Sequence, residues 1–420
     1  MSSTSNEPPI KFVSLPTAWP SPPELMSFST LMDLEACPKR WALNGALYPD
    51  IWPGSGYPRI PNLAALRGTI VHDVISLIAE GFTLRSAREN PGPRVSQVLR
   101  NLGGFTLLIG NTIEAVLRQY SENPRAFPTL KKIHVQLHAE IPELRLKSQE
   151  LLARVNFDRY ENLGISENLL SSERARYPLS SGIYSELEIK SADLGWHGFV
   201  DLLTLSSDVC EIRDFKTGRE KEQHIFQLHI YALLWLKDDV LNPLRKPVTR
   251  LLLSYLNHDI EIPPPEPRDY LRIEANIKER TARAHLSIKP MPPNAIVNDE
   301  NCGFCQVRHL CNEYWDVQQK HSPKKSIGKE SPFIDMQAII IARRGPSSWD
   351  AKVVSCCFAL SGSPILIVDL TTSLGILKEG DKIRLLNIYV STGEDEAGPG
   401  KQPLTVSFGN HSEYFVLPRF

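Results

Sequence analysis

The chain has 420 residues, enough for two or three domains, and 42% hydrophobic with 23% charged residues is the composition of an ordinary globular protein. The formal net charge of -1 neither favours nor excludes nucleic acid as a partner, because a basic groove can lie on a neutral protein. No apolar run reaches the roughly 18 residues of a membrane span, and no secretory signal opens the sequence. We therefore expect a cytoplasmic protein with no membrane contact.

The N-terminal quarter predicts an arm and two helical regions. Residues 1–25 are rich in proline, serine and threonine and are expected to form a flexible or extended arm. A helix follows with Ser29 as its N-cap, and Cys37-Pro38 interrupts it. After a Pro/Gly-rich loop, Gly68-x-x-x-His72 opens a second helix. A single histidine at such a position is more often a packing residue than a ligand.

Residues 84–180 are predicted to be mainly helical, because apolar side chains recur there at spacings of three and four residues. We interpret this region as a helical insertion, or cap, over the core of the first domain. It carries no motif with a recognisable chemistry. A wall of a DNA channel and a purely structural role both remain open for it.

Three predicted strands then bring acidic residues together. The first, around Tyr184–Ile189, carries Glu186 and Glu188, which alternation would place on one face. The second carries Asp201, and the third ends in Asp214-Phe215-Lys216, where Asp214 and Lys216 share a face. If Asp201 lies alongside, two carboxylates and an ammonium group converge. Oxygen ligands of this kind suit Mg²⁺ or Mn²⁺, although an isolated Asp-x-Lys is usually a solvated strand edge.

The remaining elements of the first domain follow in order. An amphipathic helix carries Gln227 and Tyr231, one turn apart, and Thr249–Leu256 is a further apolar strand. The segment Arg268–Leu286 predicts a charged amphipathic helix. Its basic side chains could follow DNA phosphates, but a solvated face is the commoner explanation.

Three of the seven cysteines lie close together near residue 305. The spacing Cys302-x2-Cys305-x5-Cys311 provides three soft ligands, one fewer than a structural zinc ion or an iron–sulfur cluster usually has. Cys37 is the natural fourth ligand. Spacing alone leaves both metals open, and either would tie together distant parts of the chain. The other three, Cys210, Cys356 and Cys357, lie in apolar strands and are expected in cores.

The C-terminal part changes to short strands with turns. Residues 319–334 are polar and predict a linker, and five or six strands over residues 335–420 predict an OB-like β-barrel. Such barrels commonly bind single-stranded nucleic acid, but this one is not strongly basic, so protein binding remains comparably open. We expect few contacts across the linker, so that the barrel would be separable.

Several of these motifs together resemble the PD-(D/E)XK nucleases, specifically the RecB-like branch. The matching segments are Gly68-x-x-x-His72, Gly198-x-x-Asp201, Asp214-x-Lys216-Thr217-Gly218 and Gln227-x-x-x-Tyr231. One early and three late cysteines resemble the iron–sulfur arrangement of the AddB nuclease domain and of CRISPR-adaptation exonucleases. The resemblance covers roughly residues 26–318 and implies an α/β fold: a restriction-endonuclease-like mixed sheet flanked by helices.

The resemblance also implies roles for individual residues. Asp201 and Asp214 would hold the Mg²⁺ or Mn²⁺ ion, His72 would complete its ligands, and Glu186 is a further candidate. Lys216 would position the attacking water, and Gln227 and Tyr231 would fix the DNA backbone or the lysine. The four cysteines, Cys37, Cys302, Cys305 and Cys311, would bind a [4Fe-4S] cluster, with zinc as the alternative.

The function implied is metal-dependent hydrolysis of DNA, with exonuclease action on single-stranded ends, in repair, recombination or defence. A helicase or another repair or defence protein is a candidate partner. The alternative from another class is a non-catalytic subunit that binds DNA ends or acts as a scaffold. It is disfavoured because none of the motif ligands, nor the lysine, is missing from the sequence.

Overall fold

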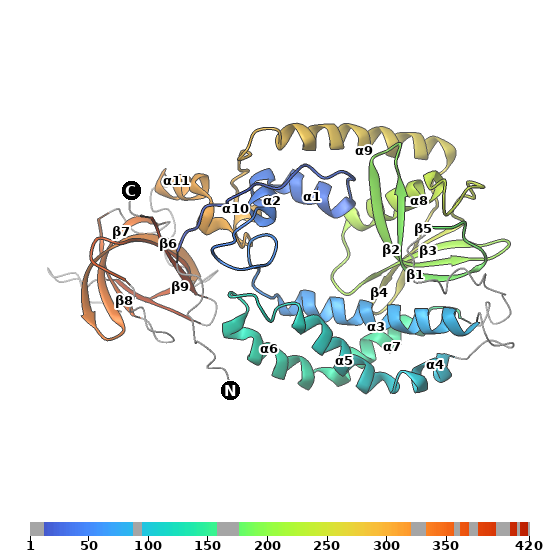
Figure 1. Ribbon diagram of the computed structural model, residues 1–420, viewed down its shortest axis with the longest axis horizontal. Coiled ribbons are helices and arrows are strands. Elements are labelled where there is room, and N and C mark those ends of the chain that lie inside the picture. The colour runs from blue at the N-terminus through green and yellow to red at the C-terminus, as the bar shows by residue number, and fades with distance from the viewer. Residues whose placement is uncertain are drawn as a thin grey trace.

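The structure is a computed structural model that describes residues 12–86, 95–157, 176–320, 333–356, 362–368, 377–391, 404–409 and 412–418. Figure 1 shows three parts: a sheet with helices on both sides, a layer of helices below it, and a β-barrel at the other end. None of the described helices is both long enough and apolar enough to cross a membrane.

The core sheet has the strand order β1-β2-β3-β4-β5. Its strands are β1 (Gly182–Ser191), β2 (Trp196–Leu205), β3 (Cys210–Lys216), β4 (Arg250–Tyr255) and β5 (Asp259–Ile262). Neighbouring strands are antiparallel except β3 and β4, which are parallel. A parallel pair needs a crossover connection, and helix α8 (Glu222–Lys237) supplies it. The predicted mixed sheet flanked by helices is therefore confirmed.

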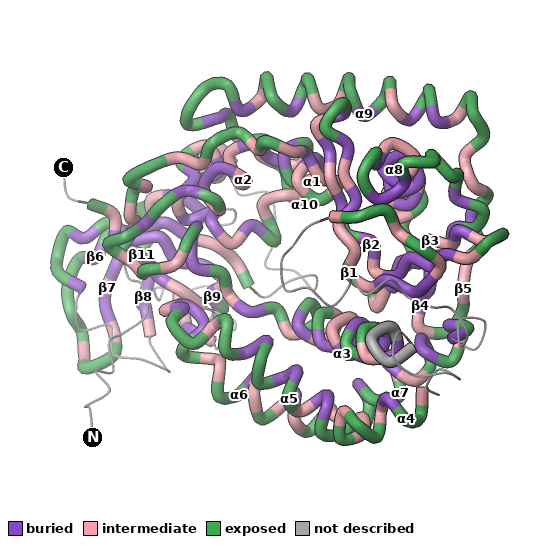
Figure 2. The backbone as a smooth tube through the Cα atoms, turned by 45° about the vertical axis from the view of Figure 1, so that its right-hand side comes forward, coloured by how far each residue is buried: buried purple, intermediate pink, exposed green. Residues whose placement is uncertain are grey.

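Both faces of this sheet are covered, because β3 sends side chains into two cores. Ile212 packs with α8 and α9 (Pro267–Ser287), whereas Phe215 packs with α3 (Leu63–Ser86) and the helical layer. Figure 2 shows α8 largely buried and α9 along the outside with one exposed face. The α9 residues that are buried recur at helical spacing, which agrees with the predicted charged amphipathic helix.

The helical layer comprises α4 (Val95–Asn101), α5 (Gly104–Arg118), α6 (Phe127–Ala139) and α7 (Ile141–Leu152). These helices lie within the predicted helical insertion, of which residues 87–94 and 158–175 are outside the described parts of the chain. They bury their apolar faces against α3 in one continuous core, which reaches Leu202 and Phe215 of the sheet. The layer is thus part of the main hydrophobic core.

The C-terminal strands close into a five-stranded barrel. They are β6 (Phe333–Gly345), β7 (Ser348–Cys356), β8 (Pro364–Val368), β9 (Lys382–Ser391) and β10 (Leu404–Ser407). Closure comes from β10, which pairs in parallel with β8 and antiparallel with β9. A further strand, β11 (Glu413–Val416), pairs with β9. The closed barrel confirms the β-barrel expected from the sequence.

The expectation of few contacts between the barrel and the rest of the chain is wrong. Of the predicted linker, residues 321–332 lie outside the described segments, and its described ends belong to α11 (Asn312–Lys320) and β6. An apolar cluster joins Trp315 to Phe415, and Arg125, 1% exposed, makes a two-bond ion pair with Glu413 at 2.7 and 2.9 Å. The N-terminal arm takes part as well, since Val13 donates a backbone hydrogen bond to Val416.

Candidate active site and cysteine pocket

Three possible metal ligands from three elements lie close together at one side of the sheet. His72 comes from α3, Glu186 from β1 and Asp201 from β2, and their ligand atoms all lie within 4.8 Å of one another. His72 Nδ1 is 3.5 Å from Asp201 Oδ2, and the same oxygen accepts a 2.6 Å hydrogen bond from the Phe215 backbone N–H. Burial opposes protonation of His72, but Asp201, Asp214 and Glu186 together outweigh it and raise the pKa of the ring.

Glu186, not Glu188, joins this set, and the backbone explains why. Glu186 has φ +47°, a left-handed conformation that is uncommon for glutamate. The register places it opposite Asp201, because Ser185 pairs with Leu202 and Leu187 pairs with Val200. Glu188 instead contacts His197. Position along the strand therefore separates the two glutamates, because Glu188 pairs with Phe199. Desolvation together with the Asp201 charge raises the pKa of Glu186 to about 7.

Asp214 and Lys216 lie beside these ligands and bind each other. Lys216 Nζ is 2.6 Å from Asp214 Oδ2 and donates a 3.0 Å hydrogen bond to Gln227 Oε1. Gln227 Nε2 in turn donates to the Tyr231 hydroxyl at 2.7 Å. Burial raises the pKa of the Asp214 carboxyl, the Asp201 charge raises it further, and Lys216 opposes both effects. The lysine is thus held from two sides, and Asp214 is not one of the three clustered metal-ligand candidates.

Two motif glycines make room for residues of other motifs. A Cβ added at Gly198 would lie 2.6 Å from Tyr231 Cε1, and one added at Gly68 would lie 2.9 Å from Thr217 Oγ1. Both distances are shorter than normal van der Waals contacts. These glycines therefore let α8 approach β2 and let α3 approach the turn after β3.

Sequence reasoning missed two residues next to the lysine. Tyr255 ends β4 beside Lys216 in the parallel register, and its hydroxyl lies 2.7 Å from His224 Nδ1 on α8. Burial, with help from Lys216 and Lys221, lowers the pKa of His224 to about 4, so this ring is neutral at neutral pH. The sequence signal was a tyrosine at the end of the strand parallel to the Asp-x-Lys strand.

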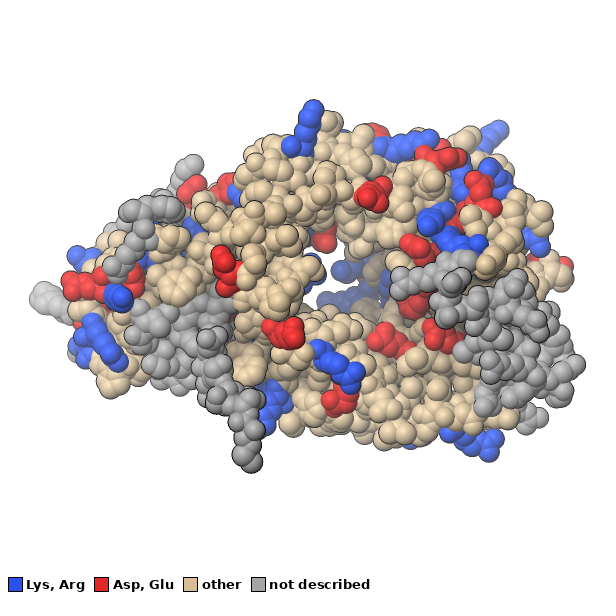
Figure 3. Space-filling model, viewed as in Figure 1, with Lys and Arg blue, Asp and Glu red and all other residues tan. Residues whose placement is uncertain are grey.

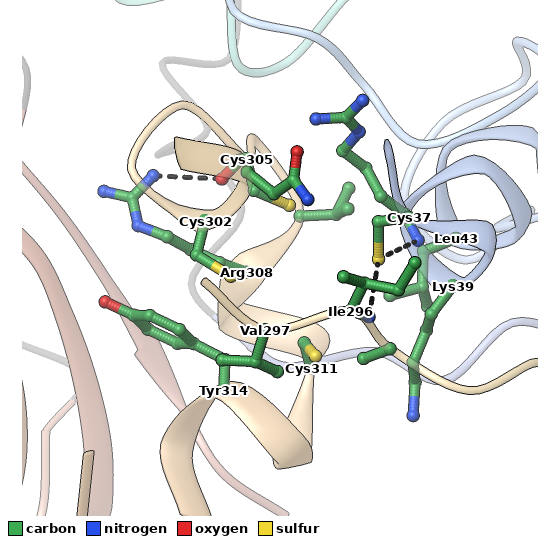
Figure 4. A pocket seen from close by; sticks show the side chains of 14 residues that line it. Cys37, Lys39, Leu43, Ile296, Val297, Cys302, Cys305, Arg308, Cys311 and Tyr314 are labelled. Carbon is green, nitrogen blue, oxygen red and sulfur yellow. Dashed lines mark hydrogen bonds between the residues drawn. The ribbon is translucent and has the colours of Figure 1, made fainter. Parts of the chain in front are cut away.

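The four cysteines predicted to act together line one pocket. Cys37 lies between α1 (Phe28–Ala36) and α2 (Pro38–Gly45), and Cys302, Cys305 and Cys311 come from α10 (Asp299–Cys302) and the segment after it. Figure 4 shows Cys37 opposite the other three. Its Sγ accepts backbone N–H bonds of 3.4 Å from Arg40 and from Ile296.

The sulfur atoms are spread around this pocket. We considered groups of three or more possible metal ligands whose ligand atoms lie within 4.8 Å of one another. In the described part of the chain, none of these groups contains a cysteine. No three of these sulfurs therefore lie that close together. Cys210 and Cys356 are buried in the sheet and barrel cores, as expected, and Cys357 lies outside the described residues.

Residues 25–312 match the family model described as the PD-(D/E)XK nuclease superfamily, so the chain belongs to this superfamily. No curated protein sequence matches the chain. The solved structures that are similar include SSO0001, with 20% identity over 31% of this chain and 59% of that one, at a TM-score of 0.19. Another is the p204 HINb domain, with 9% identity over 57% of this chain and 94% of that one, at a TM-score of 0.18. The chain thus spans less than two thirds of SSO0001.

Proposed function

We propose that this protein is a metal-dependent DNA exonuclease of the RecB-like branch that acts on single-stranded ends. The observation that carries the proposal is the convergence of His72, Glu186 and Asp201 beside the Asp214–Lys216 pair. Membership of the nuclease superfamily supports hydrolysis of a phosphodiester bond as the reaction.

His72, Asp201 and Glu186 would hold the divalent cation, with Asp214 alongside, because one imidazole and several carboxylates fit Mn²⁺ well and Mg²⁺ acceptably. When bound, the cation would lower the pKa of a water molecule and offset phosphate charge. Asp214 and Gln227 fix the Lys216 ammonium beside these ligands, so it can orient that water or a phosphate oxygen. Gln227 and Tyr231 then act through the lysine.

An opening in the molecule supports binding of a DNA strand. Figure 3 shows a passage through the molecule, with Lys and Arg side chains in its depth. Compared with Figure 1, it lies between the α1–α2 segment and α3, the helix that carries His72. The Lys and Arg side chains in this opening would favour the phosphates of a DNA strand.

We propose a [4Fe-4S] cluster for the cysteine pocket in preference to zinc. Zinc–sulfur bonds of about 2.3 Å place the sulfurs of a tetrahedral site only about 3.8 Å apart. No three of the four sulfurs here lie within 4.8 Å of one another, which suits a larger group. The two N–H bonds to Cys37 Sγ are of the kind that stabilises thiolate ligands of such clusters.

We propose that the barrel is OB-like and contacts single-stranded DNA. Five strands with a parallel β8–β10 pair support the first statement. Phe333 and Tyr389, which are 51% and 45% exposed, pair across β6 and β9 and support the second, because bases stack on exposed aromatic rings.

The test of the nuclease is release of labelled nucleotides from linear single-stranded DNA with Mg²⁺ or Mn²⁺. Lys216→Ala should lose about 100-fold or more of the rate, because the ammonium stabilises charge that develops during reaction. Lys221→Ala, which changes a nearby exposed lysine, should retain most of it.

Two outcomes of this assay would contradict the proposal. Cleavage of circular single-stranded DNA would identify an endonuclease. End binding without nucleotide release, with either metal, would identify the non-catalytic scaffold instead.

For the cysteine pocket, anaerobically purified protein should be brown and contain about four iron and four acid-labile sulfide per chain. Cys305→Ala should lose both and be less stable, because the cluster joins distant segments. Cys210→Ala, at a buried cysteine outside the pocket, should keep its iron. Colourless wild-type protein with one tightly bound zinc ion would show that the pocket binds zinc and not an iron–sulfur cluster.

A further inference from the structure

A second set of possible metal ligands lies in the helical layer, away from both sites described above. Glu114 belongs to α5, and His134 and His138 belong to α6. The two histidines are four residues apart and therefore on the same side of the helix. Each Nε2 lies 2.8 Å from the same oxygen, Glu114 Oε1, and the ring centroids are 4.5 Å apart.

The packing of α5 and α6 holds these side chains outward. Ile113 and Leu117 of α5, and Ile133 and Leu137 of α6, are buried in the core that these helices share with α3. The side chains of Glu114, His134 and His138 remain 49%, 44% and 35% exposed. A metal ion in solution can therefore reach all three without any rearrangement of the core.

We propose that Glu114, His134 and His138 form a surface zinc site, with water as the fourth ligand. Two imidazole nitrogens and one carboxylate oxygen are a ligand set that Zn²⁺ commonly takes, and histidines four residues apart on a helix often provide such a pair. Zinc bonds of about 2.0–2.1 Å separate tetrahedral ligand atoms by about 3.3 Å, so each nitrogen moves about 0.5 Å from the oxygen. Small side-chain rotations in these exposed residues provide that movement.

The two clusters of His, Asp and Glu ligands found among the described residues differ in the ion that they favour. The set around His72 has one imidazole and two carboxylates, and its oxygen ligands suit Mg²⁺ or Mn²⁺. The α5–α6 set has two imidazoles and one carboxylate, which Mg²⁺ binds poorly and Zn²⁺ binds well. Excess Mg²⁺ therefore leaves the second site free for zinc.

Bound zinc would act on the connection between the helical layer and the barrel. It would join Glu114 of α5 to the second half of α6, a helix that begins two residues after Arg125. Arg125 holds Glu413 of β11 and also donates to the backbone carbonyls of Pro58 and Gln306. The site would thus stabilise the helix pair that carries this contact.

The test is the zinc content of the intact protein, with its cysteine sites filled as purified, after dialysis against Zn²⁺ in excess Mg²⁺. Wild type should bind one more zinc per chain than a variant with both His134→Ala and His138→Ala. His285→Ala, at an exposed histidine on α9, should bind as much as wild type. Equal zinc in wild type and the double variant would overturn the site and leave only a hydrogen-bonded cluster.

A second variant separates ligand loss from a folding defect. Glu114→Gln keeps a hydrogen-bond acceptor between the histidines but removes the charge, so zinc affinity should fall about tenfold or more while the circular dichroism stays unchanged. Zinc should also raise the melting temperature of wild type in Mg²⁺ but not that of the double variant. Unchanged zinc affinity in Glu114→Gln would show that the Glu114 carboxylate is not a zinc ligand.

Discussion

At the scale of single residues, Glu186 combines an unfavourable backbone conformation with a candidate metal ligand. Its φ of +47° costs a non-glycine residue about 1–2 kcal/mol, which the surrounding strands must offset. The conformation turns its carboxylate toward His72 and Asp201. Without a cation, that carboxylate also faces the charge of Asp201, which is one reason for its raised pKa.

Replacing Glu186 by glycine and by alanine separates these two effects. In EDTA, Glu186→Gly should be more stable to urea than Glu186→Ala by about 1 kcal/mol, because glycine adopts positive φ without strain. In Mg²⁺, wild type should gain more stability than either variant, because both lack the carboxylate. Equal stability of the two variants in EDTA would show that the backbone at this position is not strained.

At the scale of elements, the contact between β2 and α8 depends on Gly198. The ring of Tyr231 occupies the space that a Cβ at Gly198 would need, and the Tyr231 hydroxyl begins the hydrogen-bond chain through Gln227 to Lys216. A change on β2 can therefore move the lysine on β3 without touching it.

Gly198→Ala should reduce the cleavage rate about tenfold or more and cost about 1–3 kcal/mol of stability, because the ring must move. Gly110→Ala is the matched control, since nothing lies within 4 Å of a Cβ added there, and it should leave both quantities unchanged or raise stability. In a Tyr231→Ala background the stability cost of Gly198→Ala should disappear. A cost that persists there would locate the strain elsewhere.

The sequence predicted most of these elements, but it did not show why particular residues are needed at their positions. Spacing grouped Cys302, Cys305 and Cys311, and Cys37, their expected fourth partner, lines the same pocket. The strand pattern predicted Asp201 near Asp214, and β2 and β3 pair at these positions. The choice between Glu186 and Glu188 required the strand register, which places Glu186 and not Glu188 opposite Asp201. The close approach of Gly198 to Tyr231 is a contact between elements, which no local pattern encodes.

At the scale of the whole molecule, the barrel and the cysteine segment share one interface. Arg308, between Cys305 and Cys311, bonds to Asp335 of β6 and to Asn387 of β9, and the buried His309 ring stacks on Phe415 with centroids 3.8 Å apart. A polar linker in the sequence gave no information about these surfaces. We therefore predict that the nuclease part and the barrel fold as one unit.

We therefore predict that cutting the chain between the nuclease part and the barrel will not separate them. A protease site inserted between residues 325 and 326 and then cleaved should leave two fragments that elute together on size exclusion and separate only in urea. Residues 1–320 expressed alone should be insoluble or lack the metal group of the cysteine pocket, because Trp315 and its neighbours lose their apolar partners. Fragments that separate in native buffer would contradict this.

The contacts between distant segments also set the order in which the chain can mature during translation. Cys37 leaves the ribosome early, yet its Sγ accepts a hydrogen bond from Ile296, 259 residues later, and its three partner cysteines follow that residue. Val13 can form its backbone hydrogen bond only after Val416 has been synthesised. Domains usually fold from the N-terminus as they emerge, but here Val13 and Cys37 cannot make these contacts until Val416 and Ile296 have been synthesised. Insertion of the proposed metal group would therefore have to follow synthesis of Cys311, the last of the four cysteines.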